Sequence, residues 1–135
     1  MHYDANASRL ILTAARWARD LGHSYVGSEH LLLALTQEPG WTGQLLRSSG
    51  LDTDIVQLFA RGLNGSGRSD LPLPQGLSRS ARGILRGAAA EAKRLQSRQV
   101  GSLHILLSLL RQQDTGAQEL MSAAAADRVS DRRVF

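Results

Sequence analysis

The chain has 135 residues and a formal net charge of +4 at pH 7, and it contains no cysteine. This length fits one domain with a core of its own, and the lack of cysteine excludes disulfides, thiolate zinc sites and a cysteine nucleophile. The longest unbroken apolar run, Leu31–Leu35, is far too short to cross a bilayer, and the first residues do not resemble a signal peptide. We therefore expect a soluble, cytoplasmic protein that makes no contact with a membrane.

The first half of the chain predicts a long helix followed by a buried one. Apolar residues from Ala7 to Leu21 follow the i, i+3, i+4, i+7 spacing of an amphipathic helix, and Asp4 is placed to cap it. Gly27-Ser28 then predicts a turn with Ser28 as the N-cap of a helix over residues 29–37. This second helix is apolar in nearly every direction, so we expect it to be buried on most sides.

Two shorter helices complete the first half. One is predicted from Trp41 to Ser49, where Gly50 closes it. Asp52 caps the next helix, for which we expect the inward-facing side chains to be Ile55, Leu58, Phe59 and Leu63. Residues 64–76 combine glycine, asparagine, serine and proline, which is typical of a linker.

The second half predicts the same order of elements. Ser78 caps a long helix, Gly101-Ser102 predicts a turn with Ser102 as the N-cap of a buried helix over residues 103–113, and an alanine-rich helix covers 115–126. No segment alternates apolar and polar residues for long enough to predict a strand. We therefore predict an all-α domain over 1–135 with about eight helices. Its parts are a first repeat at about 4–63, a linker at 64–76, a second repeat at about 77–126 and a tail at 127–135.

The two halves repeat each other in sequence. Residues 4–36 recur at 78–110, an offset of 74 residues. The identical pairs are Ala7/Ala81, Ala14/Ala88, Ala15/Ala89, Ala18/Ala92, Leu21/Leu95, Val26/Val100, Gly27/Gly101, Ser28/Ser102, His30/His104, Leu32/Leu106, Leu33/Leu107 and Leu35/Leu109. The pattern indicates a duplicated unit, so we expect two four-helix repeats related by a pseudo-two-fold axis.

The segment from Leu21 to Leu35 reads Leu-Gly-His-Ser-Tyr-Val-Gly-Ser-Glu-His-Leu-Leu-Leu-Ala-Leu. It resembles the signature of the Clp N-terminal repeat, which occurs twice at the start of ClpC-like and ClpA-like AAA+ unfoldases. The resemblance covers Asp4 to about Met121. It implies a domain without a cofactor that collects protein substrates and adaptors, in bacterial protein quality control, for a hexameric ATP-driven ring and its peptidase.

No enzymatic activity is expected of such a domain. The chain lacks the G-x-x-x-x-G-K-[ST] phosphate loop that an ATPase module would need. It also lacks the G-x-S-x-G elbow of many serine hydrolases. The sequence therefore predicts a recognition module, which acts with its ring in the same chain or in another one.

Ser28 and Glu29 are the candidate binding residues. In some Gram-positive relatives the glutamate of this motif pairs with phosphoarginine on substrates, and the resemblance carries that role to Glu29. A helix N-terminus attracts phosphate, while a neighbouring carboxylate can hold the guanidinium. The alternative is that Ser28 caps the helix and Glu29 complements the helix dipole. Leu103 replaces the glutamate in the second repeat, so Ser102 marks a degenerate second site.

The histidines and tryptophans have structural and functional interpretations. His30 and His104 recur in both repeats without a second histidine or cysteine at ligand spacing, so we predict hydrogen-bonded core histidines and no metal site. His23 is expected to be exposed in its loop. Trp17 and Trp41 are candidate anchors for a partner, or they pack against the neighbouring repeat.

The positive charge leaves two other functions open. Arg79, Arg82 and Arg86 fall at helical spacing, and Arg79 and Arg82 join Trp41 as candidate partner contacts. A basic helical nucleic-acid binder would use such a face, although the scattered charges favour a solvated surface. The other alternative is a free-standing regulatory protein that binds degradation signals or a small ligand.

Overall fold

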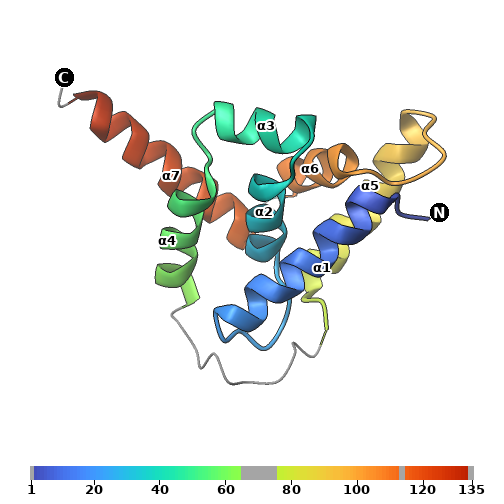
Figure 1. The fold of residues 1–135 in the computed structure, drawn as a ribbon, viewed down its shortest axis with the longest axis horizontal. Coiled ribbons are helices and arrows are strands. Elements are labelled where there is room, and N and C mark those ends of the chain that lie inside the picture. The colour runs from blue at the N-terminus through green and yellow to red at the C-terminus, as the bar shows by residue number, and fades with distance from the viewer. Residues whose placement is uncertain (1, 65–75, 113–114, 134–135) are drawn as a thin grey trace.

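The computed structural model describes residues 2–64, 76–112 and 115–133, with the backbone alone at 62–64 and 126–133. These residues form only helices and connecting segments (Figure 1), which confirms the predicted all-α class. The predicted linker falls almost wholly on residues 65–75, outside the described residues. The helices are α1 (Ala5–Asp20), α2 (Ser28–Gln37), α3 (Trp41–Ser48), α4 (Thr53–Asn64), α5 (Arg79–Arg94), α6 (Ser102–Arg111) and α7 (Gly116–Arg133).

The described residues hold seven helices, whereas the sequence predicted about eight. The first repeat breaks between α3 and α4 at Gly50, whose φ of 97° is a left-handed conformation. Ala124 takes the corresponding position in the second repeat, and alanine is the best helix former. The helix therefore continues, and α7 runs through residues 127–133, which the sequence analysis had assigned to a tail.

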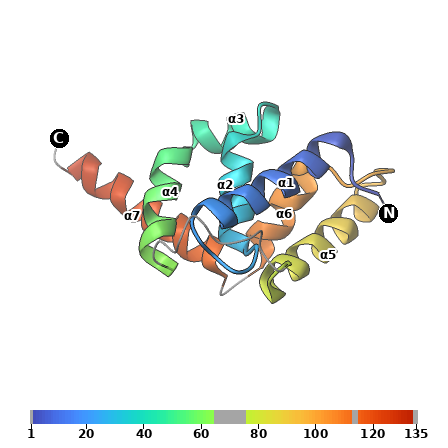
Figure 2. The same cartoon turned by 60° about the horizontal axis from the view of Figure 1, so that its bottom comes forward.

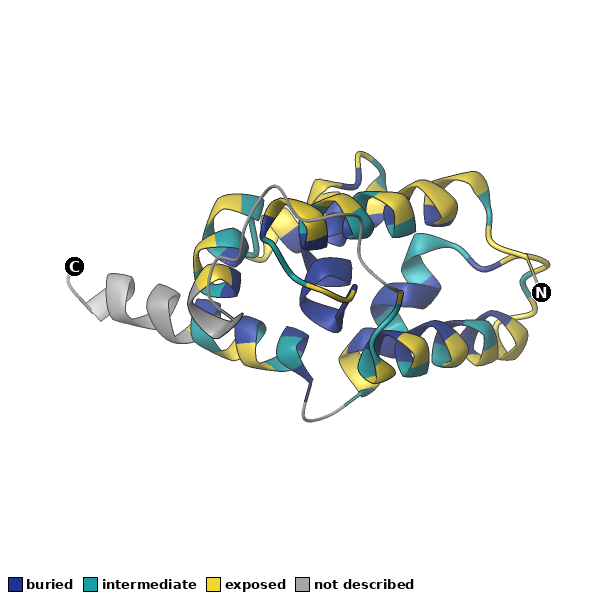
Figure 3. Ribbon diagram, turned by 90° about the horizontal axis from the view of Figure 1, so that it is seen from below, coloured by how far each residue is buried: buried dark blue, intermediate teal, exposed yellow. Residues whose placement is uncertain are grey.

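Helix α2 is the centre of the molecule. It contacts each of the six other described helices, and all its residues from Ser28 to Thr36 are buried. In the surrounding helices, buried residues lie on the inward faces and exposed residues on the outward faces (Figure 3). The predicted burial of α2 is thus confirmed. None of the described helices has the length and apolar composition needed to cross a membrane.

The long helices α1 and α5 pack through small residues. Each contributes three alanines that are 0% exposed: Ala7, Ala14 and Ala18 in α1, and Ala81, Ala88 and Ala92 in α5. Helix α1 lies against α2, and α5 lies against α6 (Figure 2). The two predicted caps are confirmed, since Asp4 Oδ1 accepts from the Ala7 amide at 2.8 Å and Ser78 Oγ accepts from the Ala81 amide at 3.1 Å.

Two isolated β-bridges join the repeats in a symmetric way. Tyr3 pairs with Val100, and Leu77 pairs with Val26. Each bridge is closed by two backbone hydrogen bonds of 2.8–2.9 Å. The offset of 74 residues relates Tyr3 to Leu77 and Val26 to Val100, so one contact is made twice, each time between the repeats. This reciprocity is what a pseudo-two-fold axis between two copies requires.

The inward face of α4 matches the predicted one only in part. Phe59 packs against the core, as predicted, and the side chain of Leu63 lies outside the described residues. Val56 and Ala60 are fully buried, whereas Leu58 is 67% exposed. Because successive residues turn by about 100° around a helix, burying Val56 and Ala60 directs Leu58 outwards. The expectation that Leu58 faces inwards was therefore wrong, although Asp52 does cap the helix, with its Oδ1 3.0 Å from the Ile55 amide nitrogen.

Gly43 and Gly83 form a matched pair for a test of packing. A methyl group at Gly43, in α3, would overlap the carbonyl oxygen of Glu38, whereas at Gly83, in α5, the nearest neighbouring atom would lie 3.7 Å away. We expect Gly43→Ala to lower the free energy of unfolding by about 2 kcal/mol. Gly83→Ala should raise it by about 0.5 kcal/mol, because alanine loses less backbone entropy on folding. Urea unfolding of both variants measures the difference, and changes of the same sign would contradict this packing.

Candidate functional site

A pocket of about 550 Å³ opens where three helices begin. The starts of α2, α5 and α7 form its wall together with the loop that precedes α2. Its lining residues are Gly22, His23, Ser24, Tyr25, Gly27, Glu29, Ser78, Ser80, Gly116 and Glu119. The pocket therefore lies between the repeats, and each repeat contributes one glutamate.

Ser28 does not cap α2, so that prediction was wrong. The N-cap is Gly27, and Ser28 is the first residue of the helix with 0% exposure. The Ser28 Oγ instead accepts a hydrogen bond of 3.0 Å from the amide of Ala117, at the start of α7. That amide belongs to the first turn of α7, where no carbonyl of the same helix can accept from it. Ser28 thus fixes the start of α7 beside α2.

A histidine in the first turn of α2 holds this N-cap residue in place. The Gly27 amide donates to Nδ1 of His30 at 2.8 Å, so this nitrogen carries no proton. The ring proton therefore lies on Nε2, which donates to Nδ1 of His23 at 2.7 Å. The pKa of His30 is lowered to about 3, mainly because the ring is buried and secondly because of the charge of His23. His30 is thus a neutral, hydrogen-bonded core histidine, as predicted.

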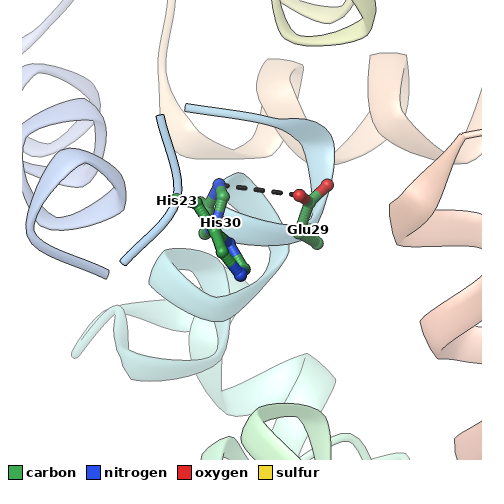
Figure 4. A group of neighbouring side chains, drawn as sticks. All are labelled: His23, Glu29 and His30. Atoms are coloured by element: carbon green, nitrogen blue, oxygen red, sulfur yellow. Dashed lines mark hydrogen bonds and ion pairs between the residues drawn. The ribbon is translucent and has the colours of Figure 1, made fainter. Parts of the chain in front are cut away.

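His23 and Glu29 complete this cluster at the pocket wall. His23 is partly buried and bonded to His30, so the expectation of a simply exposed side chain was wrong. Glu29 is 9% exposed, and its Oε1 lies 3.8 Å from Nδ1 of His30 (Figure 4). A Cβ atom on Gly27 would lie 2.6 Å from Glu29 Oε2. The glycine therefore leaves room for this carboxylate at the positive end of α2.

The structure brings together three side chains that could ligate a metal ion. His23, Glu29 and His30 each offer a ligand atom, and these atoms lie within 4.8 Å of one another. The spacing of these residues in the sequence does not predict the cluster, although His23 stands in the same motif as Glu29 and His30. Both nitrogens of His30 are already engaged in hydrogen bonds. The geometry therefore favours a hydrogen-bonded relay from Gly27 to His23 over a metal centre.

The start of α6 repeats the backbone arrangement with other side chains. His104 Nδ1 accepts from the Gly101 amide at 2.9 Å, as His30 does from Gly27. The N-cap of α6 is Gly101, so the prediction that Ser102 caps this helix was also wrong. The Ser102 hydroxyl donates to Thr42 Oγ1 at 3.1 Å, so this serine also binds the opposite repeat. A Cβ atom on Gly101 would lie 2.9 Å from Oδ2 of Asp4. An aspartate from the other repeat thus stands where α2 uses its own glutamate.

The other candidate residues lie outside the pocket lining. Trp41, at the start of α3, is 64% exposed, and Arg79 and Arg82 are exposed on α5. Trp17 is partly buried against the core, and its Nε1–H donates to Gln37 Oε1 at 2.9 Å. Trp17 thus makes this hydrogen bond within its own repeat.

The low pKa of His30 makes the stability of the fold depend on pH. In the unfolded chain this histidine binds a proton below its ordinary pKa of 6.5, whereas in the folded protein it stays neutral down to about 3. The contribution of neutral His30 to the free energy of unfolding is therefore complete above pH 6.5. It declines as the pH falls towards 3, with a limiting slope of about 1.4 kcal/mol per pH unit. We expect His30→Asn, whose Oδ1 can accept from Gly27, to reduce this slope in urea unfolding between pH 6.5 and 4.5. His2→Asn, at an exposed position, is the control, and equal slopes for all three proteins would contradict the assignment.

Comparison with known proteins places each repeat in one family. The model of the Clp repeat (R) N-terminal domain matches residues 2–72 and 76–134. The chloroplastic chaperone protein ClpC2 of Oryza sativa is 29% identical over 126 residues, which cover 93% of this chain and 14% of that protein. ClpC3 of the same plant is 35% identical over 107 residues, which cover 78% of this chain and 12% of that protein. The chain thus spans a small part of the length of these relatives.

Solved structures show the same fold. The N-terminal domain of the chaperone ClpD from Arabidopsis thaliana superposes with a TM-score of 0.74 at 22% identity, covering 95% of this chain and 97% of that one. The Hsp104 N-terminal domain from Candida albicans superposes with a TM-score of 0.74 at 22% identity, covering 93% of this chain and 83% of that one. With a family match on each half and this shared helical arrangement, the chain belongs to the Clp repeat (R) N-terminal domain family.

Proposed function

We propose that this chain is a non-catalytic recognition domain that captures protein substrates and adaptors for a Clp-type, ATP-driven unfoldase and its peptidase. Family membership supports this role, because relatives that match the chain are chaperones and ATP-binding subunits of Clp proteases. We place it in bacterial protein quality control in the cytoplasm. The ring that it serves belongs to the same chain or to a separate one.

The single observation that carries a binding role is the chemistry of the pocket between the repeats. Its wall combines two carboxylates, Glu29 and Glu119, with backbone at the starts of α2, α5 and α7. Helix starts present N–H groups and a partial positive charge, which favour an anion. Carboxylates beside them favour a guanidinium. A ligand that carries both groups on one side chain, as phosphoarginine does, fits this combination.

Within the predicted pair of site residues, the contacts favour Glu29 as the one that meets the ligand. The Ser28 hydroxyl is fully buried and accepts a hydrogen bond from the Ala117 amide, so it stabilises the pocket wall without facing the ligand. That bond holds the start of α7, where Gly116 and Glu119 line the pocket. We propose that Glu29 accepts the guanidinium and that backbone amides of the helix starts bind the phosphate.

Partner proteins have a separate surface available. Trp41 is 64% exposed and Leu45, one turn along α3, is 45% exposed. Partly exposed tryptophan is enriched among the residues that dominate binding energy at interfaces. We propose that Trp41 contacts an adaptor or substrate, with Arg79 and Arg82 as further contacts on α5.

Titration calorimetry with free phosphoarginine tests the pocket. We expect Glu29→Gln to weaken binding by about tenfold or more, because a charge-assisted hydrogen bond contributes about 1.5–3 kcal/mol. Asp54→Asn, which removes an exposed negative charge from α4, is the matched control and should bind as the unmodified protein does. Arginine and inorganic phosphate, titrated separately, should each bind more weakly than the combined ligand.

Equal heats from the unmodified protein and Glu29→Gln would refute Glu29 as the guanidinium acceptor. Binding of inorganic phosphate as strong as that of phosphoarginine would show that the pocket recognises the anion alone.

A further inference from the structure

A second hollow, of about 390 Å³, lies along α5 and shares no residue with the first pocket. It is open to solvent and is lined by Tyr3, Leu77, Arg82, Leu85, Arg86 and Ala89. Four of these residues offer aromatic or aliphatic surface, and the other two are arginines. The hollow therefore combines an apolar floor with guanidinium groups, whereas the first pocket carries carboxylates.

The hollow lies where the two repeats meet, but both of its charged residues belong to the second repeat. Tyr3 and Leu77 are equivalent residues, since 74 positions separate them, and each belongs to one of the two β-bridges. The same offset relates Arg82 and Arg86 to Ser8 and Leu12 of α1. Leu12 is 62% exposed. At these two equivalent positions α5 therefore carries arginines, whereas α1 carries a serine and a leucine.

The two guanidinium groups have no acidic partner among the described residues. The side chains of Arg82 and Arg86 are exposed and make no hydrogen bond or ion pair among the described residues. Glu91, the acidic residue of α5, already binds Arg94 at 2.7 Å and Arg111 at 2.8 Å. Arg82 and Arg86 lie one turn apart, about 6 Å along the helix axis. Carboxylates that approach the hollow would meet two unpaired guanidinium groups.

We propose that this hollow binds an acidic peptide segment that carries apolar side chains. An apolar side chain contacts Tyr3, Leu77 and Leu85, while carboxylates beside it pair with Arg82 and Arg86. Two guanidinium groups on successive turns of an open surface suit acidic side chains within a segment, so we commit to an internal segment of a partner protein. The proposal rests on the proposed recognition of partner proteins, in which Arg82 is a contact residue, and it does not depend on phosphoarginine binding in the first pocket.

Calorimetric titration with a short peptide of alternating leucine and aspartate, acetylated and amidated at its ends, tests the proposal. We expect Arg82→Gln/Arg86→Gln to weaken binding of this peptide by about tenfold, which corresponds to the loss of two exposed charge pairs. Arg16→Gln/Arg19→Gln removes the same charge from exposed positions of α1 outside the hollow and should leave the affinity unchanged. Phosphoarginine titrations of both double variants report separately on the first pocket.

Peptides of matched length separate the contributions. Replacing aspartate by lysine, or leucine by serine, should abolish binding if both the charge and the apolar side chain are needed. Equal losses in the two double variants would overturn the proposal, because they would indicate a response to net charge alone. Binding that requires a free C-terminal carboxylate would overturn the commitment to an internal segment.

Discussion

The structure depends on how the backbone polar groups at the start of a fully buried helix find hydrogen-bond partners within the protein. Helix α2 contacts all the other described helices, so the polar groups at its start need partners inside the protein. His30 accepts from the Gly27 amide, and Ser28 accepts from the amide of Ala117. The first bond fixes the turn before α2, and the second fixes α7 against it. The Val26–Leu77 bridge, in which the Ser78 amide donates to the Val26 carbonyl, joins the start of α5 to the same place, so the starts of α2, α5 and α7 meet at the pocket.

Duplication explains why the repeats interlock, and divergence explains why their surfaces differ. The β-bridges and the serines at the starts of α2 and α6 join the two halves reciprocally. Side chains around the two cavities differ between the repeats, although the frame that holds them is shared. Leu103 stands in place of Glu29, and Ser8 stands in place of Arg82. One framework thus offers an acidic pocket at one place and a cationic, apolar hollow at another.

Much of the fold follows from short-range patterns in the sequence. The spacing of apolar residues in α1 and α5, the caps Asp4 and Ser78, and the burial of α2 were all predicted. The predictions failed in two respects: where one helix ends, and how a helix is rotated about its axis when it packs. Ala124 lets α7 continue where the first repeat has a break at Gly50. Leu58 faces solvent because α4 packs through Val56 and Ala60.

The sequence by itself determined the duplication and the helical class, because both are visible in residue types at fixed spacing, and its resemblance to the Clp N-terminal repeat indicated the family and Glu29 as a candidate site residue. Only the tertiary structure decided that Ser28 supports α7 instead of capping α2, and that His23 bonds to His30. It also decided which residues share each cavity. The Ser28–Ala117 bond spans 89 positions of the chain. Such a contact depends on how whole helices pack, and no local pattern specifies it.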